Sequence, residues 1–440
     1  MKKLFVEEVI GKVGQEVELY GWVNNIRDHK QIIFVDLRDR SGIVQVVGDG
    51  RFKQLTPEDV VYIKGIVKER PKNLVNPKLP TGTVEVQAKD LKLLSKAQEL
   101  PLDMSKDELN VSLPTLLDYR SLTLRHAKIS TIFKVQEAIV DEFHNIAKKL
   151  GCVEIFVPTI AASATEGGAE VFSFQYYNHW ASLTQSPQLY KQMLIPIFEQ
   201  VYTIAHAYRA EPSVTTRHLS ENTQLDCEFG FANFNDLLDL LEQVGTTMIK
   251  QAEQVCQQEL KNHNVPPVSF GKVPRLTLSE AQEIIAKEIN RNVKGEKDLS
   301  PEDEIALCKW SLKTYNSDFV TVTHFPTQKR AFYTLPDPTN PQVSLSFDLL
   351  FRGLEIASGS QRINNYAALV DAITKRGLKP QQFAMYLMAF KYGMPPEGGF
   401  SFGLERITKQ MLGLANVREA SLFPRDMERV DVRLSTVEAK

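Results

Sequence analysis

Short β-like segments fill the first hundred residues of the chain, and they limit this part to few folds. Each is rich in Val, Ile and Tyr, and turn residues such as Asp39-Arg40-Ser41-Gly42 separate one from the next. The segments read EVELYGWV, QIIFVDLRD, GIVQVVG, DVVYIKGIVKE and TVEVQAKDLKLL. About five strands in so short a stretch predict a small barrel or sandwich. A barrel of the OB type would present a sheet face and loops to single-stranded nucleic acid.

Two side chains of this predicted barrel could contact a nucleic acid base. From Ile32 to Leu37, strand alternation puts Phe34 and Asp36 on one face and Val35 on the other. Gln45 lies on the following segment, so a ring and an amide could stack on a base and hydrogen-bond to its edge. Composition alone favours a simpler interpretation, in which Phe34 belongs to the core and Gln45 is only solvated.

A change of pattern after residue 100 marks a second, larger part of the chain. Residues 101–125 are polar and charged, as is typical of a hinge. Residues 126–440 then alternate between helix and strand patterns, with a strand at 153–157 and a long helix at 234–260. An earlier amphipathic helix, ending near Gly151, is predicted by apolar residues at helical spacing: Ile132, Val135, Ile139, Phe143 and Ile146.

Composition excludes several classes of protein. The net charge of −2 means that the chain is not basic overall, although nucleic acid binding needs only a local basic face. The cysteines lie far apart without a C-x-x-C pair, which argues against zinc and for a reducing compartment: Cys152, Cys227, Cys256 and Cys308. No signal peptide is evident, and no apolar run approaches the roughly 20 residues of a membrane helix. We therefore expect a cytoplasmic protein that does not insert into membranes.

Two clusters in the larger part indicate nucleotide chemistry. In Tyr208–Leu219, guanidinium groups could hold phosphates while Glu211 accepts an exocyclic amine; the alternative is a charged hairpin tip. In Gly398–Arg406, a glycine-rich strand places Arg406 in the first turn of a helix, where an anion is favoured. A structural glycine turn is an equal alternative there, and the chain has no Walker-type P-loop.

Two further clusters suggest ligands for a metal and for a small zwitterion. Asp348, Glu355 and Ser358 supply the hard oxygen ligands that Mg²⁺ prefers beside phosphates, provided that a bend brings them together. The alternative is a strand with ordinary surface charges. Glu166, flanked by glycines, suits a lid loop that receives an ammonium group, and Lys191 could receive a carboxylate, although this pattern is weak by itself.

Taken together and in this order, the clusters resemble the motifs of the class II aminoacyl-tRNA synthetases. The amphipathic helix, the strand and Pro158 are similar to motif 1, YRAE with TTRHL to motif 2, and GFSFGLER to motif 3. Other segments look like the archaeal-type aspartyl subgroup: ATEGGAEVF, LTQSPQLYKQ, FDLLFRGLEIASGSQR, YGMPP and NVREASLFPRD. The resemblance covers essentially the whole chain. It implies an α+β fold, with an OB-fold anticodon-binding domain (1–100), a hinge (101–125) and a catalytic domain (126–440) whose antiparallel sheet is flanked by helices.

The same resemblance implies a role for each matching residue. Arg209 and Arg406 would be catalytic. ATP would be bound by Arg209, Glu211, Arg217, His218, Leu219, Glu355, Gly403 and Arg406. Aspartate would be bound by Glu166, Gln188, Lys191, Arg209, Ser358 and Arg362. Mg²⁺ would be bound by Asp348, Glu355 and Ser358. The tRNA anticodon would be contacted by Phe34, Gln45, Asn24 and Pro80.

The implied reaction joins L-aspartate to tRNA-Asp with ATP and Mg²⁺. As a pair of cations, Lys191 and Arg362 would be neutralised by a side-chain carboxylate and left unpaired by an amide, which favours aspartate over asparagine. An asparaginyl enzyme and a paralogue without ligase activity are the alternatives. The sequence departs from the family before motif 2, at Ala205-His206-Ala207, and in motif 3, at Ser401, which bears on rate more than on identity.

The resemblance also raises the question of partners. Motif 1 implies a homodimer. Relaxed members of the subgroup tend to have a proline where selective members have a lysine, and Pro80 lies at that place, so we expect tRNA-Asn to be charged as well. Lys78 weakens this expectation because it is close in the loop, and Asn24 favours neither outcome. Charging of tRNA-Asn would imply a tRNA-dependent amidotransferase as a partner.

Overall fold

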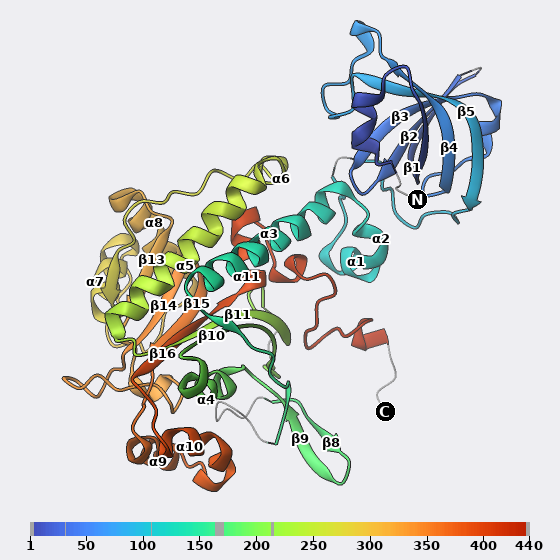
Figure 1. Cartoon of the computed structure of the whole chain (residues 1–440). Coiled ribbons are helices and arrows are strands. Elements are labelled where there is room, and N and C mark those ends of the chain that lie inside the picture. Colours follow the sequence, from blue (N-terminus) through green and yellow to red (C-terminus); the bar gives the residue numbers. More distant parts are fainter. Residues whose placement is uncertain (1–3, 31, 107, 163–170, 213–214, 437–440) are drawn as a thin grey trace. The chain divides into compact units, whose positions relative to one another are not determined.

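The computed structural model describes residues 4–30, 32–106, 108–162, 171–212 and 215–436 and divides into two compact units, Met1–Val111 and Ser112–Lys440 (Figure 1). The first unit is a closed barrel with the strand order β1-β2-β3-β5-β4. Its strands are β1 (Glu16–His29), β2 (Ile32–Asp39), β3 (Gly42–Gly48), β4 (Val60–Glu69) and β5 (Val84–Ser95). Its 3₁₀ helices are η1 (Val6–Lys12), η2 (Gly50–Gln54) and η3 (Lys72–Leu74). The predicted small barrel is thus confirmed.

The β2 strand alternates between the barrel core and the outer face. Ile33, Val35 and Leu37 are fully buried, whereas Phe34 and Asp36 lie between them on the outside and are only partly covered. This alternation arises because successive side chains of a strand point to opposite faces. The interpretation that Phe34 belongs to the core is therefore wrong, and its ring is presented on the outer face.

An eight-stranded sheet forms the centre of the second unit, in the order β12-β13-β14-β15-β16-β11-β10-β6. These strands are β6 (Val153–Glu154), β10 (Gln200–Tyr208), β11 (Glu221–Gly230), β12 (Arg275–Thr277), β13 (Phe319–Thr323), β14 (Ser346–Phe351), β15 (Leu354–Gln361) and β16 (Glu397–Gly403). Only the two edge pairs, β12 with β13 and β10 with β6, run parallel. The predicted antiparallel sheet is confirmed. A separate small sheet contains β7 (Ile160–Ala161), β8 (Ser173–Tyr176) and β9 (His179–Leu183).

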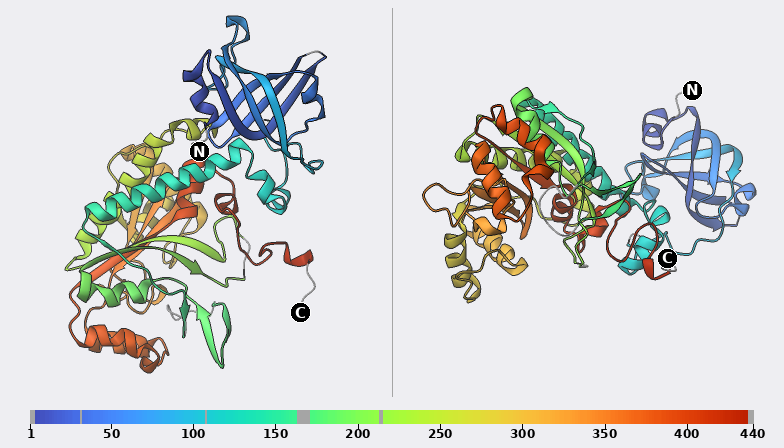
Figure 2. Two further views of the ribbon diagram at one scale, coloured as in Figure 1. Left: turned by 45° about the vertical axis from the view of Figure 1, so that its right-hand side comes forward. Right: turned by 90° about the horizontal axis from the view of Figure 1, so that it is seen from below.

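Helices cover both faces of the large sheet. They are α1 (Leu113–Asp118), α2 (Arg120–Thr123), α3 (Ala127–Lys149), α4 (Gln188–Phe198), α5 (Phe234–Val255), α6 (Gln257–Asn262), α7 (Leu278–Ile289), α8 (Pro301–Tyr315), α9 (Tyr366–Lys375), α10 (Ala384–Lys391) and α11 (Leu404–Leu412), with 3₁₀ helices η4 (Thr327–Lys329), η5 (Pro380–Phe383), η6 (Val417–Ala420) and η7 (Leu434–Thr436). The largest core lies between the sheet and α3, α5 and α11 (Figures 1 and 2). In the part of the chain that the structure describes, no helix has the length and apolar character to cross a membrane.

The predicted amphipathic helix of motif 1 is confirmed, and its end follows from one glycine. All five residues predicted to form its apolar face are buried in α3. The helix stops at Lys149, and Gly151 has a φ of +82°, a left-handed conformation that costs a glycine little. The strand predicted at 153–157 forms only over Val153–Glu154, where it pairs with β10. The helix predicted at 234–260 is interrupted at Cys256.

The strand β11 shows how the sheet separates its core from a polar face. Leu225, Cys227 and Phe229 point into the core with α3 and α5. Asp226 and Glu228 alternate with them and so point to the opposite face, where both are fully buried. Apolar side chains of α4, α9 and α10 form a second core that covers part of that face. A buried polar layer under these helices is where a ligand pocket is expected.

Candidate active site

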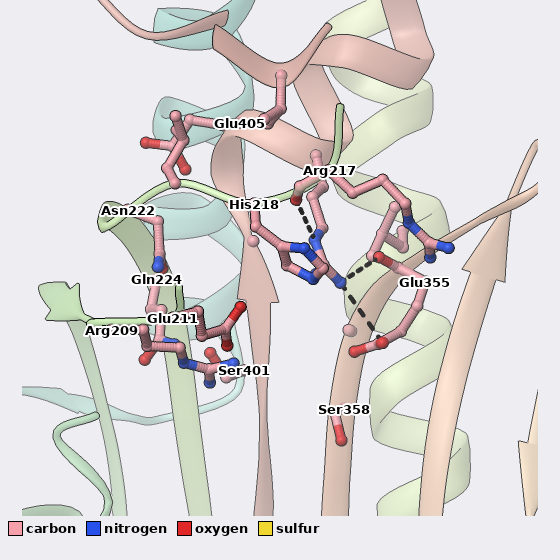
Figure 3. A pocket seen from close by; sticks show the side chains of 16 residues that line it. Arg209, Glu211, Arg217, His218, Asn222, Gln224, Glu355, Ser358, Ser401 and Glu405 are labelled. Carbon is pink, nitrogen blue, oxygen red and sulfur yellow. Dashed lines mark hydrogen bonds and ion pairs between the residues drawn. The ribbon is translucent and has the colours of Figure 1, made fainter. Parts of the chain in front are cut away.

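One pocket contains every residue that the sequence analysis assigned to ATP. It is lined by the strand ends and loop around β10 and β11, by β15, and by the start of α11 (Figure 3). The lining includes Arg209, Glu211, Arg217, His218, Leu219, Glu355, Gly403 and Arg406. Ser358 and Ser401 line the same pocket, with Glu355 and Ser358 pointing inward from β15. Residues separated by up to about half of the chain therefore converge, and the charged hairpin tip is not the better interpretation of the first cluster.

Arg406 is fixed at the helix end by neighbours from two other segments. Its Nη1 donates to the Glu355 backbone carbonyl over 3.0 Å and lies 3.4 Å from the Glu355 carboxylate. Its Nε donates to the Arg217 carbonyl over 3.4 Å. Gly403, at the N-cap of α11, has ordinary extended backbone, and an added Cβ would meet only Arg406 atoms at 3.6 Å or more. Backbone geometry therefore does not require glycine at 403, although its small size leaves room in the pocket.

Arg217 has an ionic partner that the sequence analysis missed. Its Nη2 donates to Glu304 Oε1 over 2.6 Å, and Glu304, on α8, also accepts the Glu355 backbone N–H over 3.0 Å. Burial raises the pKa of Glu304 to about 7 against the opposing effect of Arg217. The Arg217 Nε is buried and has no hydrogen-bond partner. A buried donor without a partner is costly, so this guanidinium is prepared for an anion.

His218 stands beside this pair as a polar but weakly basic group. Burial, and then the charge of Arg406, lower its pKa. Its Nδ1 lies 2.9 Å from the Thr215 hydroxyl, which also accepts the His218 backbone N–H over 3.1 Å. A neutral imidazole held in this way can still donate one N–H to a phosphate oxygen.

The proposed metal ligands are close together, and an arginine lies between two of them. The bend expected between Asp348 and Glu355 is the turn at Arg352-Gly353, where both residues have a positive φ, and it makes Asp348 the cross-strand partner of Ser358. Arg330 donates to Asp348 Oδ2 over 2.6 Å and to the Ser358 hydroxyl over 3.1 Å. Burial raises the pKa of Asp348 to about 6. Arg330 was not among the residues predicted from the sequence.

The remaining oxygen atoms still fit a small hard cation. Glu355 and Ser358 line the nucleotide pocket, and Asp348 Oδ1 is buried without a hydrogen-bond partner. Mg²⁺ usually takes one or two carboxylates and keeps several waters, so it does not need a cage of protein ligands. Within the described ranges no three His, Cys, Asp or Glu side chains form such a cage. Glu355 and Ser358, with the unpartnered Asp348 oxygen, are the residues that would hold such a cation.

Gln188, Lys191 and Arg362, which were predicted to bind the amino acid, meet in one buried cluster. Arg362 Nε donates to Glu228 Oε1 over 2.9 Å, and Lys191 Nζ lies 3.1 Å from Glu228 Oε2. Gln188 donates to Glu228 over 2.9 Å and accepts from Arg362 over 3.1 Å. Lys191 also donates to Asp226 over 2.6 Å. Glu228 is thus the centre on which all three predicted residues converge.

The two acids correct part of the electrostatic argument made from the sequence. Lys191 and Arg362 are not unpaired cations, because Asp226 and Glu228 already balance them. The sequence contained a pattern that could have predicted this pair of acids. Residues two apart on one strand share a face, and the segment QLDCE places Asp226 and Glu228 at that spacing. The motif 3 departure Ser401 also belongs here: its hydroxyl donates to Asp226 over 3.2 Å, and it lines the nucleotide pocket. The pocket predicted for ATP and the cluster around Glu228 are therefore contiguous. Glu166, the residue predicted to bind the substrate ammonium group, lies outside the described residues.

In the barrel, the proposed anticodon residues have defined neighbours. Gln45 accepts from Arg27 over 3.0 Å and donates to Glu85 over 3.0 Å, while Arg27 also pairs with Asp36. Phe34, beside Asp36 on β2, has its ring 5.5 Å from that of His29 in an edge-on arrangement.

Asn24 and Pro80 lie in other surroundings. Asn24 accepts from Arg38 over 2.9 Å. Pro80 lies in a loop closed by hydrogen bonds from Gly82 to Leu79 and from Asn76 to Gly82.

Comparison with known proteins gives the family. The model of the tRNA synthetases class II (D, K and N) matches residues 112–427, and that of the OB-fold nucleic acid binding domain matches residues 17–94. The chain belongs to the class II aminoacyl-tRNA synthetases. Enzymes of this family use ATP, in agreement with the pocket at the motif 2 and motif 3 residues. The OB-fold domain makes this synthetase a tRNA-binding protein.

Named relatives of this synthetase match along nearly their whole length. The Aspartate--tRNA(Asp/Asn) ligase of Thermus thermophilus is 42% identical over 97% of this chain and 99% of its own. The Aspartate--tRNA(Asp/Asn) ligase of Deinococcus radiodurans is 40% identical over 98% of this chain and 99% of its own. The asparaginyl-tRNA synthetase of Pyrococcus horikoshii, complexed with asparaginyl-adenylate, is 31% identical with a TM-score of 0.90 and covers 98% and 99%.

Proposed function

We propose that this synthetase activates L-aspartate with ATP and transfers it to tRNA-Asp and to tRNA-Asn. The observation that carries the proposal is the meeting of Lys191 and Arg362 beside the nucleotide pocket, reached through Ser401. Arginine and lysine there suit an amino acid with a side-chain carboxylate. The full-length relatives that are named Asp/Asn ligases support the same substrate and both tRNAs.

The first step is attack of the aspartate α-carboxylate on the α-phosphorus of ATP, with release of pyrophosphate. A carboxylate is already nucleophilic, so positioning and charge stabilisation do the catalytic work. In the proposed roles, Arg209 contacts the α-phosphate and the substrate carboxylate. Glu211 accepts from the adenine amino group. Arg217, His218 and Arg406 hold the outer phosphates.

Magnesium completes this arrangement in the proposal. When bound, Mg²⁺ would neutralise charge that develops on the phosphates. Glu355 would hold it, assisted by the Ser358 hydroxyl, while Arg330 keeps Asp348 oriented behind them. In the second step, a hydroxyl of the terminal ribose of tRNA attacks the aspartyl carbonyl carbon of the adenylate, which forms the ester bond to tRNA and releases AMP.

A second candidate, asparagine activation, is favoured by one feature of the cluster. Lys191 and Arg362 face Asp226 and Glu228, so the cluster has a formal charge of zero, which would also suit a neutral amide. The Pyrococcus horikoshii structure also belongs to an asparaginyl enzyme. Glu166, proposed to receive the substrate ammonium, would serve either amino acid.

Amino acid-dependent exchange of pyrophosphate into ATP separates the two candidates. We expect exchange with aspartate at a kcat/KM at least about a hundredfold above that with asparagine, equivalent to about 2.7 kcal/mol. A preference for asparagine would overturn the proposal and establish the second candidate.

The proposal includes partners. Aspartylated tRNA-Asn would need a tRNA-dependent amidotransferase to become asparaginyl-tRNA. A homodimer through motif 1 is supported by exposed apolar side chains next to β6 and on β9: Phe156 is 89% exposed and Trp180 is 74% exposed. Because translating ribosomes consume the product, we place the enzyme in the cytoplasm.

A further inference from the structure

Two carboxyl groups lie together behind the proposed amino acid pocket. Glu228, on β11, and Glu397, on the neighbouring β16, are both fully buried, and their carboxyl groups lie within hydrogen-bonding range of each other. Two carboxylates in contact away from water cannot both carry a charge, because each raises the cost of ionising the other. One of the two therefore holds a proton.

The surrounding cations decide which carboxyl is ionised. Glu228 faces Arg362 at 2.9 Å and Lys191 at 3.1 Å. In the described part of the chain, no cationic side chain pairs directly with Glu397. Burial raises the pKa of Glu397 well above its usual value, and Glu228 adds to the effect. Burial also opposes ionisation of Glu228, but Arg362 and Lys191 lower its pKa to about 2. Both effects favour Glu397 as the carboxyl group that holds the proton.

Hydrogen-bond direction places this proton on one oxygen. The Tyr386 hydroxyl donates to Gln192 Oε1 over 3.0 Å, and Gln192 Nε2 donates to Glu397 Oε1 over 2.7 Å. Glu397 Oε1 is therefore an acceptor. Glu397 Oε2 is buried, and no conventional donor reaches it. A proton on Oε2 that is donated to Glu228 gives this buried oxygen a hydrogen bond. The hydrogen bonds then all point in one direction, from Tyr386 through Gln192 and Glu397 to the Glu228 carboxylate.

The backbone of Glu397 holds the other side of the same unit. Its carbonyl accepts the Arg362 backbone N–H over 2.9 Å, while Arg362 Nη1 donates to the Ser360 hydroxyl over 2.6 Å. Glu397 thus anchors Arg362 through the main chain and Glu228 through the side chain. Tyr333 lies under the Arg362 guanidinium, which is 5.2 Å from its ring centroid. These contacts leave Arg362 little freedom to move.

We propose that Glu397 is a positioning residue, a neutral carboxylic acid whose O–H orients Glu228 and, through it, Arg362 and Lys191 toward the substrate side chain. This inference rests on the proposed aspartate chemistry. Charge balance gives the reason for a neutral group: Lys191 and Arg362 offset Asp226 and Glu228, and an ionised Glu397 would leave the cluster negative before an anionic substrate arrives. A proton at Glu397 therefore leaves the cluster neutral, so that it can accept the side-chain carboxylate of the substrate.

Two variants separate positioning from general packing. In Glu397→Gln, the amide N–H₂ can donate to Glu228 while the amide oxygen accepts from Gln192, so the variant copies the protonated acid. We expect its KM for aspartate to stay within about threefold of the wild type, since no hydrogen bond is lost. Glu397→Ala removes the donor to Glu228. We expect its KM for aspartate to rise at least about tenfold, with KM for ATP unchanged, because one charge-assisted hydrogen bond disappears.

Infrared difference spectroscopy of the intact wild-type protein against Glu397→Gln tests the proton itself. At neutral pH we expect a carbonyl stretch of a protonated carboxylic acid in the wild type that is absent from the variant. Carboxylate bands lost instead would overturn the inference, as would a Glu397→Gln variant as impaired for aspartate as Glu397→Ala. Failure of the proposed function would be distinguishable from these outcomes, because the wild type itself would then show no aspartate-dependent exchange of pyrophosphate into ATP.

Discussion

At the scale of single residues, the active site is built from charges that are already paired before a substrate arrives. Arg217 has Glu304, Arg330 has Asp348, and Arg362 has Glu228 as partners. Arg217 and Arg362 were predicted to bind a phosphate and a carboxylate, whereas Arg330 was not predicted, and none of the three acids was predicted as a counter-ion. A paired arginine is held in one orientation, which lowers the entropy cost of binding an anion.

The Arg217–Glu304 pair gives a first prediction. Glu304→Gln weakens the charge-assisted hydrogen bond to Nη2, so Arg217 loses the support that presents its free Nε to a phosphate. We expect KM for ATP to rise about tenfold, which corresponds to about 1.4 kcal/mol, and KM for aspartate to stay the same. Pyrophosphate exchange at varied ATP and aspartate measures both constants. A larger change for aspartate than for ATP would mean that Arg217 does not serve the nucleotide.

Arg362 gives a second prediction, in which stability and activity separate. Arg362→Leu removes one of two cations from a buried cluster that has two acids. We expect the free energy of unfolding to fall by about 3–5 kcal/mol and aspartate activation to be lost. Adding Glu228→Gln restores the charge balance of the cluster, because one cation, Lys191, then remains with one acid, Asp226.

The double variant should therefore recover much of the unfolding free energy while staying inactive. Urea denaturation and pyrophosphate exchange measure the two quantities. Aspartate activation by either variant would contradict the proposed role of Arg362.

At the scale of elements, the parts with a strong local pattern were predictable and the parts fixed by long-range pairing were not. The five barrel segments and α3 follow from alternation and helical spacing, which depend on near neighbours. The short β6 and the interrupted helix at Cys256 depend on packing against distant segments. Glu304 and Arg330 could not be found from sequence spacing, because α8 and the segment after β13 approach the site only in three dimensions.

The strand β16 supplies a third prediction, since its glycines have unequal surroundings. A Cβ on Gly399 would lie 2.2 Å from the Cys227 carbonyl oxygen and 2.4 Å from Glu228 Oε2. We expect Gly399→Ala to cost about 3 kcal/mol or more through overpacking. Gly403→Ala, on the same strand, should cost at most about 1 kcal/mol as a changed N-cap, but should raise KM for ATP because the methyl group enters the pocket. Equal loss of stability in both variants would contradict this reading of β16.

At the scale of the whole molecule, the proposed function divides recognition of one tRNA between the two units. The OB-fold barrel contains the residues proposed for the anticodon, and the second unit contains the residues proposed for ATP and aspartate. Amino acid choice and tRNA choice are therefore separable by mutation. A change in the barrel should alter the ratio of the two tRNA substrates without changing pyrophosphate exchange, which needs no tRNA.

The last prediction is that tRNA-Asp and tRNA-Asn are charged with kcat/KM values within tenfold of each other. Their anticodons differ only at the third base, so selectivity must come from the part of the barrel that contacts it. Pro80 lies in a loop that is closed tightly: a Cβ on Gly82 would lie 1.8 Å from the Asn76 carbonyl oxygen, so only glycine fits there. Proline has neither a backbone N–H nor a polar side chain, and it cannot favour one pyrimidine by hydrogen bonding.

Pro80→Lys should add a donor at this place and favour tRNA-Asp by about 1–3 kcal/mol, leaving aspartate-dependent pyrophosphate exchange unchanged. Aspartylation of both transcripts by the two proteins measures the ratio, and Lys78→Ala is the matched control for the charge already in the loop. If Lys78 already discriminates between the bases, Lys78→Ala alone will bring the kcat/KM values for tRNA-Asp and tRNA-Asn closer together. A wild-type preference for tRNA-Asp above about a hundredfold, or about 2.7 kcal/mol, would refute relaxed specificity and remove the need for an amidotransferase.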